Sequence, residues 1–399
     1  MNSDLLTRSL LHSGIPIKRL TLRTPAKNYY STQANPPPAF CFDIDGVLKQ
    51  GSHVLPQAKK ALAILNGNNS SQKSFPFILC TNGGGIPELE RSQKLSKELG
   101  VPITPNQLVQ SHTIFTQFLS SYRDQPILVI GGRGEKCRLV AEGYGFQQVY
   151  IPQDILRWDP SVWPFYKLTD HDRQIAKTAD FSQIPFRAIF ASSHVMHDSY
   201  DWGLDIQIAI DALTSQDGII TNPMSSITNS EDHIPIYFSN PDFLWGNEYC
   251  RPRFGQGAVQ TALRANYQRL TGRHLEAWTG GKPTRVTYDF ANHLLRKIVH
   301  DKFNGQGLGP VYMIGDNPAS DIQGANNYGW SSVLVKTGVF KGNKPEDAAH
   351  VPTAVQSDVL VRRCSLGLEA RRPRKCVVSR SSSVFSESVN EKNFIFKIK

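Results

Sequence analysis

The sequence contains no long apolar run. None of its hydrophobic stretches approaches the roughly 20 residues that a helix needs to cross a bilayer, so we expect no transmembrane helix in the 399 residues. Cysteine is scarce, and its six residues show neither a C-x-x-C pair nor the spacing of a zinc site. Cys41 and Cys80 lie in apolar stretches, where a free thiol behaves as a small hydrophobic group. These features favour a reducing compartment.

Acidic residues are outnumbered by basic ones near the two ends of the chain, and only there. The net charge is +10, of which +4 lies in residues 1–38 and +7 in residues 361–399. Residues 39–360 therefore carry a net charge of −1. A central region so close to neutrality argues against a face that binds nucleic acid.

The first 35 residues contain almost no acid. They are rich in Arg, Lys, Ser and Thr and place leucines at helical spacing, which is typical of a mitochondrial transit peptide. They lack the continuous apolar segment of a secretory signal. We expect a transit peptide and linker over residues 1–38 and a mitochondrial protein, with the matrix as its compartment. An N-terminal arm without a targeting role is the alternative.

The segment 361–399 combines like charges and serines with few apolar residues, so we expect a basic, Ser-rich, disordered tail. A contact between this tail and an anionic membrane surface is an alternative. The abrupt change of composition after residue 356 leaves open whether the tail is a genuine extension or an artefact of the gene model.

Between these ends, short apolar segments alternate with amphipathic ones, and no internal repeat is visible. Continuously apolar strands separated by helices are typical of a parallel α/β sheet covered by helices on both faces. The pattern predicts strands over residues 40–45, 75–82, 126–132, 147–152, 186–193, 234–240, 309–317 and 331–339. It predicts helices over residues 56–67, 86–100, 105–120, 136–143, 201–213, 257–270, 284–303 and 320–328.

Polar residues gather where four of these segments end. They are Asp43 and Asp45; Thr81, Asn82 and Gly83; Lys282; and Asp316 with Asp321. Ligands bind at the carboxyl ends of strands in such sheets. Carboxylates are the ligands that Mg²⁺ prefers, a glycine-rich turn admits a phosphate, and a lysine offsets the charge of a transferring phosphoryl group. The set predicts a phosphate site with a metal ion and a carboxylate free to attack.

These segments resemble the four motifs of the haloacid dehalogenase (HAD) superfamily, in the usual order. The matching residues are D-x-D-G-V from Asp43, Thr81, Lys282-Pro283, and G-D-N-P-x-S-D from Gly315. The long insertion between the second and third motifs resembles the C2-type cap of class IIA. Segments 200–207, 239–249 and 253–258 are similar to the mitochondrial cat eye syndrome critical region protein five subfamily. The resemblance covers roughly residues 39–356.

The resemblance implies an α/β fold with two parts. A Rossmann-like (HAD) doubly wound parallel sheet core would comprise residues 39–107 and 254–360. An inserted α/β C2-type cap would comprise residues 108–253, shield the site and select the substrate.

The resemblance also implies a reaction, the Mg²⁺-dependent hydrolysis of a small phosphate monoester through an aspartyl-phosphate. Asp43 would be the nucleophile, and Asp45 would be the general acid and then the base. Lys282 would neutralise charge on Asp43 and the phosphate. Asp43, Asp316 and the backbone carbonyl of Asp45 would hold Mg²⁺, and Asp321 would orient Lys282 or a metal-bound water.

The phosphoryl oxygens would be bound by Thr81, the Asn82 amide and Gly83. Asn240 and Asp242, where the chain returns from the cap, would face the substrate, although a turn-forming Asn-Pro-Asp is an equal alternative. Simpler structural roles also stay open, with Thr81 as a helix N-cap and Asp321 as a surface carboxylate.

Two other functions stay open at this point. One is a protein that binds a phosphate ligand with little turnover, and the other is a phosphotransferase with an alcohol acceptor. We expect a small phosphorylated metabolite as partner and no nucleic acid, while the oligomeric state is open, with a homodimer among the options. Some relatives are fused to CDP-alcohol phosphatidyltransferase domains, so the resemblance implies a link to glycerophospholipid metabolism.

Overall fold

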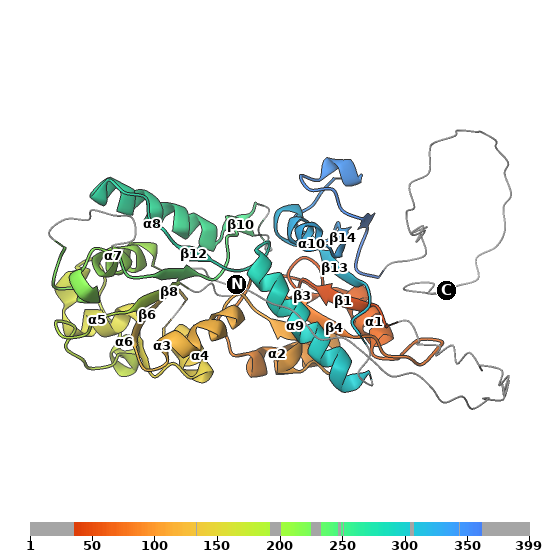
Figure 1. The fold of residues 1–399 in the computed structure, drawn as a ribbon, viewed down its shortest axis with the longest axis horizontal. Helices are drawn as coiled ribbons and strands as arrows, with labels where there is room; N and C mark the ends of the chain where they lie inside the picture. Colours follow the sequence, from red (N-terminus) through yellow and green to blue (C-terminus); the bar gives the residue numbers. More distant parts are fainter. Residues whose placement is uncertain are drawn as a thin grey trace, which may run out of the picture. The chain divides into compact units, whose positions relative to one another are not determined.

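The computed structural model describes residues 36–132, 134–191, 201–224, 233–245, 249, 251–303, 307–342 and 344–360 (Figure 1). The tail predicted over residues 361–399 and all but the last residues of the predicted transit peptide lie outside this range. Within the described part of the chain, no helix combines the length and the apolar character needed to cross a membrane.

Six strands form one sheet in the order β15-β14-β13-β1-β4-β5. All of its neighbours are parallel, as the sequence pattern predicts. The strands are β1 (Ala39–Phe42), β4 (Phe77–Cys80), β5 (Leu108–Val109), β13 (Val311–Gly315), β14 (Ser331–Val335) and β15 (Ala354–Gln356). The central strand β1 lies between β13 and β4, so the residues that follow these three strands meet at one edge of the sheet.

Helices cover both faces of this sheet because successive side chains of β1 point to opposite sides. Phe40 and Phe42 pack against α1 (Pro56–Leu65) and α2 (Glu88–Leu99). Ala39 and Cys41 pack against α9 (Arg285–Lys302), which crosses the sheet in Figure 1. The structure confirms a doubly wound α/β sheet of the Rossmann type.

Five further strands form a second parallel sheet in the order β12-β9-β8-β6-β7. They are β6 (Pro126–Ile130), β7 (Gln148–Tyr150), β8 (Ala188–Ala191), β9 (Ile236–Phe238) and β12 (Trp278–Thr279). One face packs against α4 (Lys136–Tyr144) and the other against α5 (Pro152–Trp158), α7 (Trp202–Leu213) and α8 (Gln256–Thr271).

The smaller elements include three short helices and two hairpins. The helices are α3 (Leu119–Tyr122), α6 (Asp170–Ile175) and α10 (Gln323–Tyr328). The hairpins are β2 (Lys49–Gln50) with β3 (His53–Val54), and β10 (Leu244–Trp245) with β11 (Arg253–Phe254).

The limits of the two sheets do not coincide with the predicted domain boundaries at residues 107/108 and 253/254. Strand β5 begins at Leu108 yet pairs with β4 of the six-stranded sheet. Helix α8 packs on the five-stranded sheet, and β12 pairs with its strand β9. The division into a core and a cap stays a prediction. If each part is defined by the sheet to which its strands belong, the boundaries fall within the segments 110–125 and 280–284.

The helix predicted over residues 105–120 is wrong. The segment contains a 3₁₀ turn (Pro105–Gln107), strand β5 and a second 3₁₀ segment (Thr113–Phe118). The side chain of Gln107 accepts from the backbone of Thr104 and donates to the carbonyl of Phe77, which holds the chain beside β4. Tertiary pairing therefore overrides the local helical pattern.

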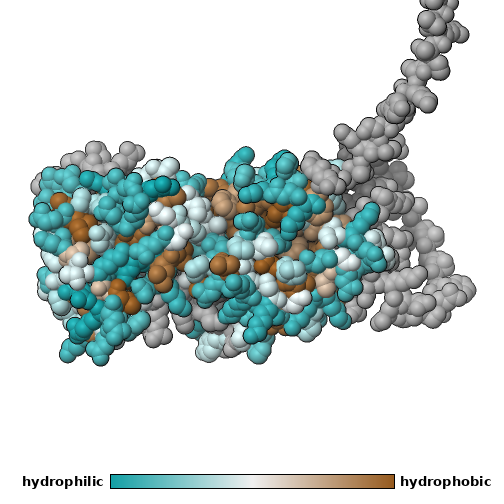
Figure 2. Space-filling view, turned by 90° about the horizontal axis from the view of Figure 1, so that it is seen from below, coloured by the Kyte–Doolittle hydropathy of each residue, from teal (hydrophilic) through white to brown (hydrophobic). Residues whose placement is uncertain are grey.

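Exposed large apolar side chains are few among the described residues. Figure 2 shows one face of the molecule, which is largely hydrophilic and carries separate hydrophobic areas. Ten large hydrophobic residues of the described part of the chain are exposed, and four of them, Phe243, Leu244, Tyr249 and Phe254, belong to the β10–β11 hairpin and its flanks. This local concentration sets the hairpin apart from the rest of the surface.

A buried polar network joins α2 to α4. The carboxylate of Glu88 accepts hydrogen bonds from Thr113 and Tyr144, both at 2.6 Å. The Nδ1 atom of His112 lies 2.6 Å from the same Tyr144 hydroxyl. Burial lowers the pKa of His112 to about 4, so the imidazole is neutral at neutral pH.

This burial predicts how stability depends on pH. The unfolded chain protonates His112 near pH 6.5, whereas the folded protein does so only near pH 4. Stability is therefore lost as the pH falls through this window, by roughly 3 kcal/mol from this group. Urea unfolding between pH 7 and about pH 4 should show a shallower decline for His112→Asn than for the wild type. The exposed His300 provides the control, since His300→Asn should follow the wild type; equal slopes for all three proteins would contradict the prediction.

Candidate active site

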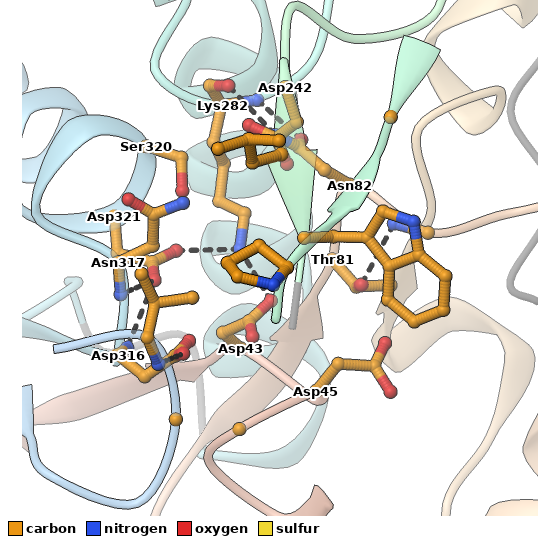
Figure 3. Close-up of a pocket in the computed structure, with 18 of the residues that line it drawn as sticks. Asp43, Asp45, Thr81, Asn82, Asp242, Lys282, Asp316, Asn317, Ser320 and Asp321 are labelled. Carbon is orange, nitrogen blue, oxygen red and sulfur yellow. Dashed lines mark hydrogen bonds and ion pairs between the residues drawn. The ribbon is translucent and has the colours of Figure 1, made fainter. Parts of the chain in front are cut away.

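The residues predicted to carry the chemistry meet at the carboxyl ends of β1, β4 and β13 (Figure 3). Asp43 follows β1, Thr81 follows β4 and Asp316 follows β13. Lys282 reaches the same place from the five-stranded sheet, because it follows β12. Together they line a cavity of about 540 Å³.

Lys282 lies between two carboxylates. Its Nζ atom is 2.6 Å from Oδ1 of Asp43 and 2.7 Å from Oδ1 of Asp321. The lysine is only 2% exposed. Burial alone would lower the pKa of Lys282, but Asp321 and Asp43 raise it well above its ordinary value, so the ammonium group stays charged.

Three carboxylates, those of Asp43, Asp316 and Asp321, offer oxygens within 4.8 Å of one another. Burial raises the pKa of Asp43 well above its usual range, against the opposing effect of Lys282. Burial and the charge of Asp321 raise the pKa of Asp316 to about 7. One lysine therefore leaves excess negative charge in the cluster, and hard oxygen donors at this spacing suit a divalent cation.

Backbone amides fix two of these carboxylates. Oδ2 of Asp321 accepts from the N–H groups of Asp316 and Asn317, both at 3.1 Å, while Oδ1 binds Lys282. Oδ2 of Asp316 accepts from the N–H of Val339 at 2.6 Å. Both oxygens of Asp321 thus accept hydrogen bonds. Of its two predicted roles, to orient Lys282 or to orient a metal-bound water, the geometry matches the first.

The carboxylate of Asp45 stands apart from the three-carboxylate cluster. Burial raises its pKa, while Arg91 and Lys49 lower it. A carboxyl group that keeps its proton more readily than usual is suited to general acid catalysis. The predicted contact of the Asp45 backbone carbonyl with the metal stays a prediction.

The side chain of Asn82 clamps the backbone of Lys282. Its Oδ1 accepts from the Lys282 N–H at 2.7 Å, and its Nδ2 donates to the Lys282 carbonyl at 2.9 Å. The neighbouring Gly281 has a φ of +76°, and a Cβ atom there would collide with Asn240 and Asn82. Asn82 therefore holds Lys282 in place, which the sequence did not indicate.

The chain that leaves β9 of the five-stranded sheet reaches the site at Asn240. Its Nδ2 donates to the Asn82 carbonyl at 3.1 Å, and its Oδ1 accepts from the Asp242 N–H at 3.0 Å. Both ends of the Asn240 amide thus make a hydrogen bond, and both Asn240 and Asp242 line the cavity. Burial raises the pKa of Asp242 to about 6, with Asn82 and Lys282 opposing the rise.

The hydroxyl of Thr81 accepts a hydrogen bond from the N–H of Gly83 at 3.0 Å. This contact occupies the Gly83 amide and leaves the hydroxyl proton free to be donated into the cavity that Thr81 lines. Helix α2 begins five residues beyond Gly83, so Thr81 is not its N-cap.

The comparison with known proteins agrees with this geometry. The profile of haloacid dehalogenase-like hydrolases matches residues 40–147, and that of HAD-hydrolase-like proteins matches residues 279–361. The mitochondrial hydrolase YKR070W of Saccharomyces cerevisiae is 41% identical over 340 residues, which is 80% of this chain and 93% of that protein. The chain belongs to the haloacid dehalogenase-like hydrolases.

Two further proteins are similar to this HAD hydrolase. A cardiolipin synthase (CMP-forming) / mitochondrial hydrolase fusion protein of Schizosaccharomyces pombe is 40% identical over 326 residues, 80% of this chain. The chain spans 52% of the length of that fusion protein. The p-nitrophenyl phosphatase of Archaeoglobus fulgidus shares the fold, with a TM-score of 0.53 and 15% identity, over 81% of this chain and 97% of its own.

Three buried side chains of the HAD hydrolase support the site without belonging to a motif. Arg91 in α2 offsets the charge of Asp45. Gln256 in α8 accepts from Ser239 and from the N–H of Asn240, and Gln260 donates to the Asn240 carbonyl. Gln256 lies in segment 253–258, whose resemblance to the subfamily gave it no role. For Arg91 and Gln260 only the amphipathic pattern of the helices was available, and that pattern does not separate polar residues that face a site from those that face water.

The Asn82 clamp generates a prediction. Asn82→Ala removes both hydrogen bonds to the Lys282 backbone, and a displacement of a reacting group by about 1 Å costs up to ~10²-fold in rate. We expect kcat for an aryl phosphate to fall about 10- to 100-fold with a much smaller change in KM. The control is Asn266→Ala, which removes an exposed amide on α8. A wild-type kcat in Asn82→Ala would show that Lys282 needs no clamp.

Proposed function

We propose that the protein is a Mg²⁺-dependent phosphatase that hydrolyses a small phosphate monoester through an aspartyl-phosphate on Asp43. The observation that carries the proposal is the position of Lys282, whose ammonium group bridges Asp43 and Asp321 inside a carboxylate-rich cavity. A protein that only binds phosphate has no need of a second carboxyl group with a raised pKa beside the nucleophile, and Asp45 is such a group.

The first half of the reaction transfers the phosphoryl group to the protein. A carboxylate oxygen of Asp43 attacks phosphorus while the bond from phosphorus to the leaving oxygen breaks. Asp45 donates its proton to that oxygen, so the product leaves as an alcohol. The Thr81 hydroxyl and the ammonium group of Lys282 bind phosphoryl oxygens and offset their charge.

The second half releases the phosphate. Asp45, now ionised, takes a proton from a water molecule, whose oxygen attacks phosphorus and displaces the Asp43 carboxylate. Inorganic phosphate and the free enzyme result. Asp321 keeps Lys282 in place through both halves.

Asp43 and Asp316 would hold Mg²⁺, with the Asp45 backbone carbonyl as a further ligand. The donor set fits, because carboxylate oxygens within 4.8 Å match a small hard cation that retains water and phosphate ligands. When bound, Mg²⁺ would act as a Lewis acid and relieve the repulsion between the carboxylates.

We also propose a mitochondrial location, in the matrix, and a link to glycerophospholipid metabolism. The acid-poor N-terminal sequence and the names of two similar proteins as mitochondrial hydrolases support the location. The fusion of one of them to a cardiolipin synthase supports the link. Protease protection of the full-length protein in isolated mitochondria, before and after rupture of the outer membrane, tests the location; digestion in swollen mitochondria would exclude the matrix.

A phosphate-release assay tests the activity. With Mg²⁺, the full-length protein should release inorganic phosphate from at least one member of a panel of phosphorylated metabolites. Removal of Mg²⁺ with EDTA should stop the release. Asp43→Asn should abolish turnover because an amide is a poor nucleophile, and Asp45→Asn should slow it about 10²- to 10⁴-fold.

Asp289→Asn is the matched control, since this carboxylate is exposed on α9, and it should retain full activity. Turnover by Asp43→Asn equal to the wild type, or release from no compound in the panel, would refute the proposal. Transfer of phosphate to added glycerol in place of water would identify a phosphotransferase.

A further inference from the structure

The cavity extends beyond the reacting groups. Besides the carboxylates and Lys282, it is lined by the β10–β11 hairpin and the stretch leading into β11, through Leu244, Trp245, Tyr249 and Arg251, and by Val339 and Lys341 after β14. A phosphoryl group bound between Asp43, Thr81 and Lys282 would take up only part of this cavity. The rest is wide enough to admit the leaving group of the substrate.

Two cations line this outer part of the cavity, Arg251 and Lys341. Both side chains are exposed, and no ion pair is recorded for either one among the described residues. Two other cations near the site differ, because Lys282 pairs with Asp43 and Asp321, and Lys49 pairs with Glu98. The outer cavity therefore carries positive charge that no described acid of the protein neutralises.

The charge has the opposite sign around the proposed phosphate site, where carboxylates predominate. Asp242 also lines the cavity, and Asn82 and Lys282 oppose the burial that raises its pKa. The cavity is thus polarised, with the three-carboxylate cluster in one part and, in another, two cations that form no ion pair with any described residue. A substrate with a neutral leaving group would make no ion pair with these two cations.

The outer wall also has an apolar part. The indole N–H of Trp245 donates to the Phe254 carbonyl at 3.2 Å, which fixes the ring within the hairpin. Trp245, Leu244 and Tyr249 offer contact area to a leaving group whatever its charge. The cations, and not this wall, distinguish charged from neutral leaving groups.

We propose that the substrate is a phosphate monoester whose leaving group carries a second negative charge, bound by Arg251 and Lys341. The proposal rests on the phosphatase function proposed above. A carboxylate and a second phosphate would both satisfy the two cations, since guanidinium and ammonium groups bind either anion.

Para-carboxyphenyl phosphate and para-carbamoylphenyl phosphate form a matched pair of probes, because they share their size and differ in one charge. Benzene-1,4-diyl bisphosphate supplies the second phosphate. The wild type should prefer the carboxylate over the carboxamide in kcat/KM by about five- to tenfold, the effect expected of partly exposed charge-assisted contacts. Added KCl should reduce this preference because salt screens exposed charges. The larger of the two anion preferences identifies the natural second anion.

Substitutions locate the effect. Arg251→Gln and Lys341→Gln should each lower the carboxylate-to-carboxamide ratio about threefold, and the double variant should bring it close to one. Arg251→Glu should bring the ratio below one. Arg253→Gln is the control, because Arg253 lies on the same hairpin over the Tyr249 ring but does not line the cavity, and its ratio should equal that of the wild type.

The outcomes separate the two proposals. Turnover of both aryl esters with a ratio near one, or a ratio that Arg251 and Lys341 substitutions leave unchanged, overturns the second-charge proposal and leaves the phosphatase function standing. Turnover of none of the three probes overturns the second-charge proposal, and if the wild type also releases phosphate from no compound of the metabolite panel, the phosphatase function falls with it.

Discussion

The buried ammonium group of Lys282 is the charge on which the site depends. Carboxylates cannot be gathered away from water without a cation close by, because an unpaired buried charge is too costly. Lys282 supplies that cation from β12 of the five-stranded sheet, while its partners Asp43 and Asp321 follow strands of the six-stranded sheet. The two ion pairs of this one lysine therefore offset the charge of Asp43, the proposed nucleophile, and connect the two sheets at the candidate active site.

The neighbours of Lys282 show how that connection is made rigid. Asn82 pairs with both polar groups of the Lys282 peptide, and Asn240 binds the Asn82 carbonyl in turn. Gln256 and Gln260 hold Asn240 from α8. All four amides are buried, and those of Asn82, Asn240 and Gln256 are bonded at both ends, as buried polar networks must be if they are to stabilise a single arrangement.

The sequence predicted those features that follow from local rules. Apolar strands alternating with helices predicted a parallel α/β sheet, and the polar residues at strand ends predicted that Asp43, Thr81, Lys282 and Asp316 meet. Features that depend on distant partners were missed or mispredicted. Residues 105–120 have a helical pattern, yet strand β5 forms there because β4 offers a free edge. The clamp by Asn82 could not be anticipated, since it joins a side chain to the backbone of a residue 200 positions away, and no pattern of residue types marks such a contact.

Arg251 and Lys341 come from different parts of the fold, and this has a consequence for the order of the proposed reaction steps. Arg251 lies in the connection between β10 and β11, on the stretch of chain between β9 and α8 of the five-stranded sheet, whereas Lys341 follows β14 of the six-stranded sheet. A leaving group bound by both side chains would bridge the two sheets from outside, as Lys282 bridges them from within. The bridge would exist only while that group is present. Departure of the alcohol product would then break this link between the two sheets, so the same two charges would select the substrate and mark the end of the first half of the reaction.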